Sequence, residues 1–380
     1  MKYIKELDSV RAIAIFVVIV HHWVSPDNLI NRILHGPIGV VTFFVLSGFL
    51  TTLVLLKNAQ AAKTSEQSKF KIFGTFYLRR ALRIYPVYYL TVLFLLAFQS
   101  MYSSFDIFKA LPYLLTFTTN FYFIKIQNWG GALAHLWSIA VQEQFYLIWP
   151  WIFLLVNKKY YLHFILAAIF VGVASQYILL GSKVYKVLPI TSLDSFGLGA
   201  LLSWQVYYHY DNLAKFFRTL NYFTATSFCL YFLSTFFNFN ILPLRTIIAI
   251  LSLWLITYIV FLKQNNNNIW ILKSKALMYI GRISYGVYLF HNIIPELTNH
   301  YLKNNVNNLL PSFTKPYGTY IIFFENFAIV LLAATLSWYF IEKPLSQFKS
   351  SLKVIPLKPI AVNTSTHPPT VPRYAEQESN

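Results

Sequence analysis

Long apolar windows with few charged residues recur along the whole chain, and they constrain its fold more than any other feature. Each window is close to the ~20 residues that a helix needs to cross the hydrocarbon core of a bilayer. The chain is 57% hydrophobic and only 12% charged, whereas soluble domains carry roughly 25% charged residues. The sequence therefore predicts an all-α integral membrane protein, built as one bundle of spanning helices.

Ten windows are predicted to cross the membrane, and one more, 107–124, is ambiguous because Pro112 and several Thr residues interrupt it. The ten candidate spans are residues 11–26, 38–56, 84–101, 138–156, 162–180, 193–209, 221–238, 244–262, 283–301 and 319–341.

The positions of Lys and Arg decide how the ambiguous window is treated, because cytoplasmic loops carry an excess of these residues. If 107–124 does not cross, 23 of the 31 Lys and Arg residues lie on the side of the N-terminus; if it crosses, the split is 16 to 15. We therefore expect about 10 transmembrane helices, N- and C-termini cytoplasmic, in the inner membrane. A membrane domain would cover 1–345, followed by a polar, disordered cytoplasmic tail over 346–380.

The net charge of +18 is explained by this cytoplasmic clustering, so no nucleic-acid partner is expected. Cys229 is the only cysteine, which excludes a disulfide or a cysteine zinc site within one chain. The histidines and acids follow no recognisable ligand spacing, so no metal is expected. The N-terminal apolar run lacks a small-residue cleavage pattern, which predicts an uncleaved first helix.

The first span, 10-VRAIAIFVVIVHHWV-24, contains three ionisable residues, Arg11, His21 and His22. Eleven positions bring Arg11 and His22 to the same helix face, roughly 16 Å apart along the axis, whereas His21 points about 100° away. An isolated histidine at such a depth is as readily a helix-packing or interfacial residue as a functional one. A second polar cluster at similar depth would favour function.

The stretch 133-LAHLWSIAVQEQFYLIWP-150 supplies such a cluster, since Ser138, Gln142 and Tyr146 form a stripe at spacing four. With the helix entering from the outer side, Gln142 and Glu143 lie one to two turns in. This predicts a depth close to that of His22.

Arg80 and Arg83 lie three positions apart on one face, at the expected cytoplasmic mouth of the third span. Such residues commonly anchor a span by the positive-inside rule. In isolation this anchoring role is the commoner one, but such a pair can also bind phosphate oxygens, because guanidinium groups bind them bidentately. Composition does not choose between the two interpretations.

Two further stretches carry polar or small residues at membrane depth. Ser47 and Gly48 lie near the middle of their span, where small residues usually serve close helix packing. Ser284, Tyr288 and His291 follow the i, i+4, i+7 spacing of one helix face. Such a stripe is expected to line a cavity rather than face lipid.

In their order along the chain, these stretches resemble the acyltransferase-3 family of integral-membrane acyltransferases, which modify bacterial surface polysaccharides. The resemblance covers about residues 3–345, and the ordered set is specific although each piece alone is weak. The matching pieces are Arg11 and His22 after 7-LDSVRAIA-14, 43-FFVLSGFL-50, 80-RALRIYP-86, 135-HLWSIAVQEQFYLIWP-150, 280-IGRISYGVYLFH-291 and 340-FIEKP-344.

The resemblance implies a membrane O-acyltransferase that moves an acyl group, commonly acetyl, from cytoplasmic acyl-CoA to a hydroxyl at the outer side. The acceptor would be a cell-surface glycan such as O-antigen, or a lipid-linked saccharide, and acyl-CoA would be a donor substrate rather than a bound cofactor. Arg80 and Arg83, with Arg11, would bind the donor. His22 would either accept the hydroxyl proton or carry the acyl group itself.

The chain departs from the family pattern at Gln142, where a glutamate is usual. Either Gln142 orients its partner by hydrogen bonding without charge, or Glu143 supplies the carboxylate from a neighbouring face, or activity is altered. Residues expected to line the cavity are Ser47, Ser138, Tyr146, Ser284, Tyr288 and His291.

Many relatives carry an added soluble hydrolase-like domain, for which this chain is expected to be too short. The membrane domain would then meet the acceptor itself or pass the acyl group to a separate partner. The alternative function is a transporter or flippase of a lipid-linked saccharide, whose polar residues would line a translocation path. The sequence has no paired discontinuous helices and no inverted repeat to support it.

Overall fold

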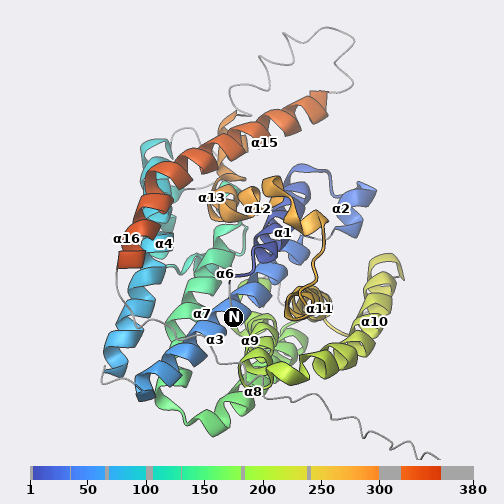
Figure 1. Cartoon of the computed structure of the whole chain (residues 1–380). Helices are drawn as coiled ribbons and strands as arrows, with labels where there is room; N and C mark the ends of the chain where they lie inside the picture. Colours follow the sequence, from blue (N-terminus) through green and yellow to red (C-terminus); the bar gives the residue numbers. More distant parts are fainter. Residues whose placement is uncertain are drawn as a thin grey trace, which may run out of the picture.

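The computed structural model describes eight stretches of the chain: 3–34, 36–64, 68–99, 106–129, 131–180, 185–237, 241–298 and 318–351. Within these stretches every regular element is a helix and no strand occurs, which confirms the all-α prediction. Figure 1 shows long helices packed into one bundle, with α4 and α16 on one side and α10 and α11 on the other.

The long helices are α1 (Glu6–Trp23), α3 (Pro37–Thr64), α4 (Lys69–Ala97), α7 (Leu136–Leu155), α8 (Tyr161–Ile178), α9 (Leu193–Tyr208), α10 (Leu213–Phe237), α11 (Leu244–Gln264) and α15 (Gly318–Ser337). The shorter helices are α2 (Leu29–Ile33), α5 (Ile107–Leu115), α6 (Thr119–Ile126), α12 (Lys275–Arg282), α13 (Ser284–Phe290) and α16 (Lys343–Ser351). In the described part, five helical segments are both long and apolar enough to cross a membrane, as a membrane protein requires. They cover 29–62, 70–97, 158–178, 244–264 and 320–347.

The ambiguous window 107–124 is not one continuous helix. It divides into α5 and α6, which have 9 and 8 residues, because Phe117 between them adopts a positive φ of 54°. At 1.5 Å per residue neither piece reaches half of the ~30 Å hydrocarbon core. Neither short helix can therefore span the membrane.

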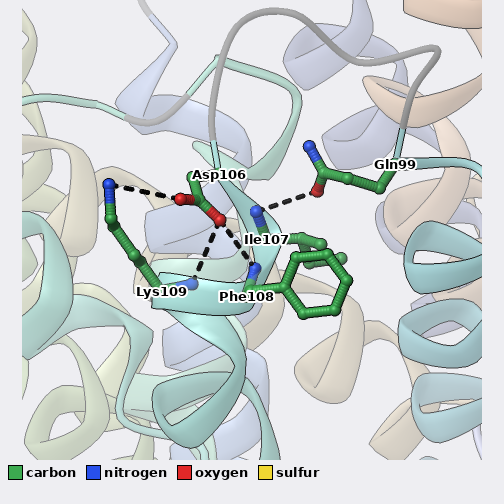
Figure 2. Close-up of polar contacts among 5 residues, drawn as sticks. All are labelled: Gln99, Asp106, Ile107, Phe108 and Lys109. Carbon is green, nitrogen blue, oxygen red and sulfur yellow. Dashed lines mark hydrogen bonds and ion pairs between the residues drawn. The ribbon is translucent and has the colours of Figure 1, made fainter.

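Asp106 begins α5 as its N-cap, as Figure 2 shows. Its carboxylate accepts hydrogen bonds from the backbone N–H groups of Phe108 (3.0 Å) and Lys109 (3.3 Å), and Lys109 Nζ lies 3.2 Å from the second oxygen. Gln99 accepts the N–H of Ile107 (2.9 Å). Three N–H groups that have no partner inside the helix are thus satisfied.

The expected span over 283–301 is wrong as a single helix. The chain forms α12 and α13, which meet at Ile283, and α13 ends at Phe290. Side chains satisfy the carbonyls freed at this end: His135 Nε2 donates to Leu289 O (3.0 Å) and Trp23 Nε1 donates to His291 O (2.9 Å). A helix can stop inside the bundle where such partners replace its own hydrogen bonds.

The bundle core contains a close crossing of α3 and α9. A Cβ atom on Gly48 would lie 2.1 Å from Phe196 O, and one on Gly199 would lie 2.0 Å from Val45 O. Small residues permit such backbone contact in membrane helices. Gly48 is therefore a packing residue.

The expected domain boundary at residue 345 falls within α16, which continues to Ser351. The remainder of the expected tail, 352–380, lies outside the described residues.

Candidate active site

A cavity between α1, α3, α4, α7 and α13 gathers ten of the twelve site residues predicted from the sequence. We call it the arginine cavity. Those ten lining residues are Arg11, Ser47, Arg80, Arg83, Ser138, Gln142, Glu143, Tyr146, Ser284 and Tyr288. The two others, His22 and His291, are not among the residues that line it.

Arg80 is held rigidly in the wall of this cavity. Its guanidinium carbon lies 3.5 Å from the ring centroid of Tyr146 and 5.1 Å from that of Phe76, and its Nη2 donates to Thr51. With aromatic rings and a hydroxyl as its partners, the positive charge has no carboxylate at hydrogen-bonding distance among the residues that the structure describes. The group is available to an anion.

Ser47 joins α3 to α7 through hydroxyl contacts. Its Oγ donates to Gln142 Oε1 (3.3 Å) and accepts the hydroxyl of Tyr146 (3.0 Å). Gln142 is thus connected to the ring on which Arg80 stacks. This arrangement suits the hydrogen-bonding role considered for Gln142.

Glu143 is the buried acid of the arginine cavity, with 9% of its surface exposed. Its Oε1 is buried and has no hydrogen-bond partner among the described residues. A buried, incompletely paired carboxyl is costly in a stable core. Such a group is typical of a site that binds a further molecule.

A neighbouring cavity, which we call the triple-arginine cavity, is lined by Arg11, Arg83 and Arg282, and also by the carboxylates of Asp8 and Glu342. It shares Leu50 and two of these arginines with the arginine cavity. Arg11 is paired with Asp8 at 2.7 Å. Arg282 was missed at the sequence level, although it lies inside the stretch that contains Ser284 and Tyr288.

His22 lies at the other end of α1 from Arg11. Its side chain is exposed and lines two further cavities. His22 makes no hydrogen bond to any residue that the structure describes, whereas the Nδ1–H of His21 donates to Asn31 Oδ1 (3.0 Å). Of the two adjacent histidines, His21 is therefore held by structure and His22 is open to a ligand.

We call these two cavities the basic cavity and the Glu296 cavity. The basic cavity is lined by His21, His22, Asn31, Arg32, Trp129, His135, Trp137, Lys186, Arg245, Tyr288 and several small or apolar residues. The Glu296 cavity is lined by His22, Trp23, Asn292, Glu296, Asn326 and neighbours.

Two buried histidines lie beside these cavities. The ring centroid of His291 lies 5.1 Å from that of His22 and 4.8 Å from that of His135. His291 Nδ1 contacts Tyr288 O at 2.6 Å, and because a carbonyl only accepts, Nδ1 carries the proton. Its Nε2 is buried without a hydrogen-bond partner in the described part of the chain. His291, expected to line the cavity, instead packs behind His22.

His135 was not singled out from the sequence. It is 2% exposed, donates from Nε2 to Leu289 O and faces Asn292 Nδ2 at 3.4 Å from Nδ1. Its position three residues before Ser138 is the signal that could have found it, because this spacing puts both on one face at the start of α7.

The expected equal depth of His22 and the pair Gln142 and Glu143 does not bring these groups into one cavity. Gln142 lies seven residues beyond His135, which is about 10 Å along the α7 axis. His22 instead adjoins the start of that helix. Two residues, Val40 and Tyr288, line both the arginine cavity and the basic cavity and so join the two regions.

Comparison with known proteins adds an independent observation. The family model described as "Acyltransferase domain" matches residues 4–342. Peptidoglycan O-acetyltransferase OatA of Listeria monocytogenes is 28% identical over 377 residues, covering 90% of this chain and 56% of that protein. No solved structure matches.

Two further relatives have provisional names of the same kind. A Staphylococcus aureus (strain COL) protein, provisionally named an O-acetyltransferase, is 26% identical over 94% of this chain and 59% of its own length. A Bacillus subtilis protein, provisionally named a peptidoglycan O-acetyltransferase, is 27% identical over 90% of this chain and 55% of its own length. The chain therefore spans little more than half the length of these relatives. Because the family model covers most of the chain, including the residues that line the arginine cavity, the protein belongs to the acyltransferase-3 family of acyltransferases.

Proposed function

We propose that the protein is a membrane O-acetyltransferase that uses acetyl-CoA as donor and a hydroxyl of a cell-envelope glycan as acceptor. One observation carries this proposal. Successive cavities share lining residues from the triple-arginine cavity, through the arginine cavity, to the basic cavity beside His22. The names of the relatives in Listeria and Bacillus support peptidoglycan as the acceptor class.

The donor would bind at the arginine end. Coenzyme A carries several phosphates, and guanidinium groups hold phosphate oxygens in bidentate pairs. Arg80, Arg83 and Arg11 offer three such groups around joined cavities. The thioester would then extend toward His22, roughly 16 Å from Arg11 along α1.

The reaction moves an acetyl group from sulfur to oxygen. The acceptor hydroxyl oxygen attacks the thioester carbonyl, the C–S bond breaks and a C–O ester bond forms. The hydroxyl proton leaves through His22 and ends on the sulfur of coenzyme A. His22 acts either as this general base or as a nucleophile that carries the acetyl group between the two substrates.

A direct test replaces His22 with Ala and measures acetyl transfer from labelled acetyl-CoA to purified cell-wall glycan. We expect at least a hundredfold loss of rate, the size typical for a general base. His163→Ala is the matched control, because His163 is an exposed residue of α8 outside the four cavities. Retained activity in His22→Ala would contradict the proposed centre. Failure of the wild-type protein to release coenzyme A with any glycan would favour transport of a lipid-linked saccharide instead.

The donor site has its own test. Arg80→Met and Arg83→Met should weaken acetyl-CoA binding about tenfold each, as expected for a lost charge-assisted contact. Arg218→Met removes the same charge from the exposed side of α10 and should leave binding unchanged. Equal affinity in all three variants would exclude the arginine clamp.

The membrane arrangement is part of the same proposal. Ten spans in the inner membrane, with both termini cytoplasmic, would put Arg80 inside and His22 outside. The only cysteine, Cys229, can be replaced by Ser, and single cysteines introduced at Asn267 and Asn128. An impermeant thiol reagent added to intact cells should label Asn128→Cys and spare Asn267→Cys; labelling of both or neither would reject this topology.

A further inference from the structure

The basic cavity beside His22 has an unbalanced charge. Three cations, Arg32, Lys186 and Arg245, line it, and among its described lining residues none is Asp or Glu. The Glu296 cavity, which His22 also lines, contains a carboxylate. A charged ligand would therefore experience a different field in each of the two cavities that adjoin this imidazole.

Arg245 fixes the segment that carries Lys186. It is 6% exposed, and its Nη1 donates to Lys186 O (2.8 Å) while its Nη2 donates to Ser192 Oγ (2.7 Å). Asn120 Nδ2 donates to the next carbonyl, that of Val187, at 3.3 Å. The backbone at Lys186 is thus held from two sides, which fixes the point from which its exposed side chain extends.

The ammonium group of Lys186 lies in a setting that disfavours its own charge. Burial and the like charge of Arg245 lower the pKa of Lys186. An anion in the basic cavity would relieve this repulsion, as any bound counter-charge does. The cavity is therefore better suited to an anionic ligand than to a neutral one.

Two tryptophans complete the wall of the cavity. Trp129 and Trp137 both line it, and Arg245 lies 5.8 Å from the ring of Trp137. Indole rings offer broad apolar faces against which the C–H face of a sugar can pack, with polar groups free at the ring edge. Aromatic walls and cations together match a charged saccharide.

We infer that the acceptor is a glycan carrying an oxyanion, a carboxylate or a phosphate, near the hydroxyl that is acetylated, and that Lys186 and Arg32 recognise it. This inference rests on the proposed function and names the substrate class of its acceptor side. Arg245 acts on Lys186 rather than on the ligand, since its own donors are committed to protein oxygens.

The test compares three acceptors with purified full-length protein and labelled acetyl-CoA. The first is a cell-wall glycan fragment with its sugar carboxylates intact, the second is its carboxyl-reduced neutral form, and the third carries phosphate diesters. Wild-type protein should acetylate at least one anionic acceptor with kcat/KM about tenfold above the neutral form. The first and third acceptors distinguish the carboxylate from the phosphate source.

Lys186→Met should reduce this preference for the anionic acceptor severalfold, mainly through KM, and Lys186→Arg should restore most of it. Lys125→Met is the matched control, because Lys125 is exposed on α6 and lines none of the four cavities. Quenching of tryptophan fluorescence by each glycan gives a binding readout that does not depend on turnover.

The outcomes separate the two proposals. Equal kcat/KM for the neutral and anionic acceptors, or a preference unchanged in Lys186→Met, would overturn the inference about the acceptor and leave acetyl transfer standing. Absence of transfer to all three acceptors, with no glycan binding, would overturn the proposed function and the inference together.

Discussion

The imidazole rings of His22 and His291 lie 5.1 Å apart, centroid to centroid, although one closes α1 and the other follows α13. His291 uses Nδ1–H on Tyr288 O and keeps a buried Nε2 lone pair without a partner among the described residues. A neutral acceptor beside His22 can orient that ring or share its proton. We therefore predict that His291 positions His22 in the proposed centre.

Replacing His291 with Phe should therefore lower kcat by about a hundredfold, the range of a general-base contribution, with donor affinity little changed. The decisive measurement is the pH dependence of kcat, because loss of a proton-sharing neighbour shifts that profile whereas loss of packing alone does not. His291→Asn keeps a polar side chain and should recover part of the rate. An unshifted profile with normal thermal unfolding would contradict the positioning role.

Gln142 provides a second prediction, since it accepts from Ser47 and is linked through Ser47 to Tyr146, whose ring lies under Arg80. Gln142→Glu keeps an acceptor at the same place, whereas Gln142→Leu leaves the Ser47 hydroxyl without one. We expect the Leu variant to raise the KM for acetyl-CoA about tenfold and the Glu variant to lose less. The reverse order in steady-state kinetics would show that the missing family carboxylate, not the hydrogen bond, limits activity.

Much of the site was predictable because helical spacing is regular. The stripe of Ser138, Gln142 and Tyr146 follows from spacing four, and the structure brings it to one cavity with Arg80 and Arg83. Side-chain direction on a helix depends only on local geometry. Residues placed on one face by sequence therefore reach the same side of the bundle.

Other features depend on partners far away in the sequence. The end of α13 at Phe290 is possible because His135 and Trp23 satisfy the carbonyls of Leu289 and His291. The backbone carbonyl of Lys186 is held by a hydrogen bond from Arg245, which belongs to another helix. No local pattern in either stretch encodes these distant partners. Periodicity therefore predicted a continuous span over 283–301, and it gave no reason to select Lys186.

Close packing of α3 on α9 leads to a prediction about stability. Gly199→Ala would bring a methyl group to 2.0 Å from Val45 O, so one helix must move, at a cost of about 1–3 kcal/mol. Gly74→Ala is the control, because nothing lies within 4 Å of a Cβ there and alanine favours a helix over glycine. The midpoint temperature of thermal unfolding in detergent should fall by several degrees for Gly199→Ala and not for Gly74→Ala. Equal midpoints in the two variants would refute the close contact.

The Asp106 N-cap predicts that the stability of the first turn of α5 depends on pH. The backbone N–H of Lys109, followed by its side chain, holds the pKa of Asp106 below its usual value. A carboxyl whose pKa falls on folding stabilises the folded state at pH values above its unfolded-state pKa, which is about 4. This stabilisation is lost as the pH falls through the lower pKa of the folded state. Amide exchange at Phe108 and Lys109, corrected for intrinsic rates, should therefore speed up below about pH 4. Asp106→Asn caps the helix without titrating, so its exchange should lack this acid transition, and the same transition in both proteins would rule out Asp106 as its cause.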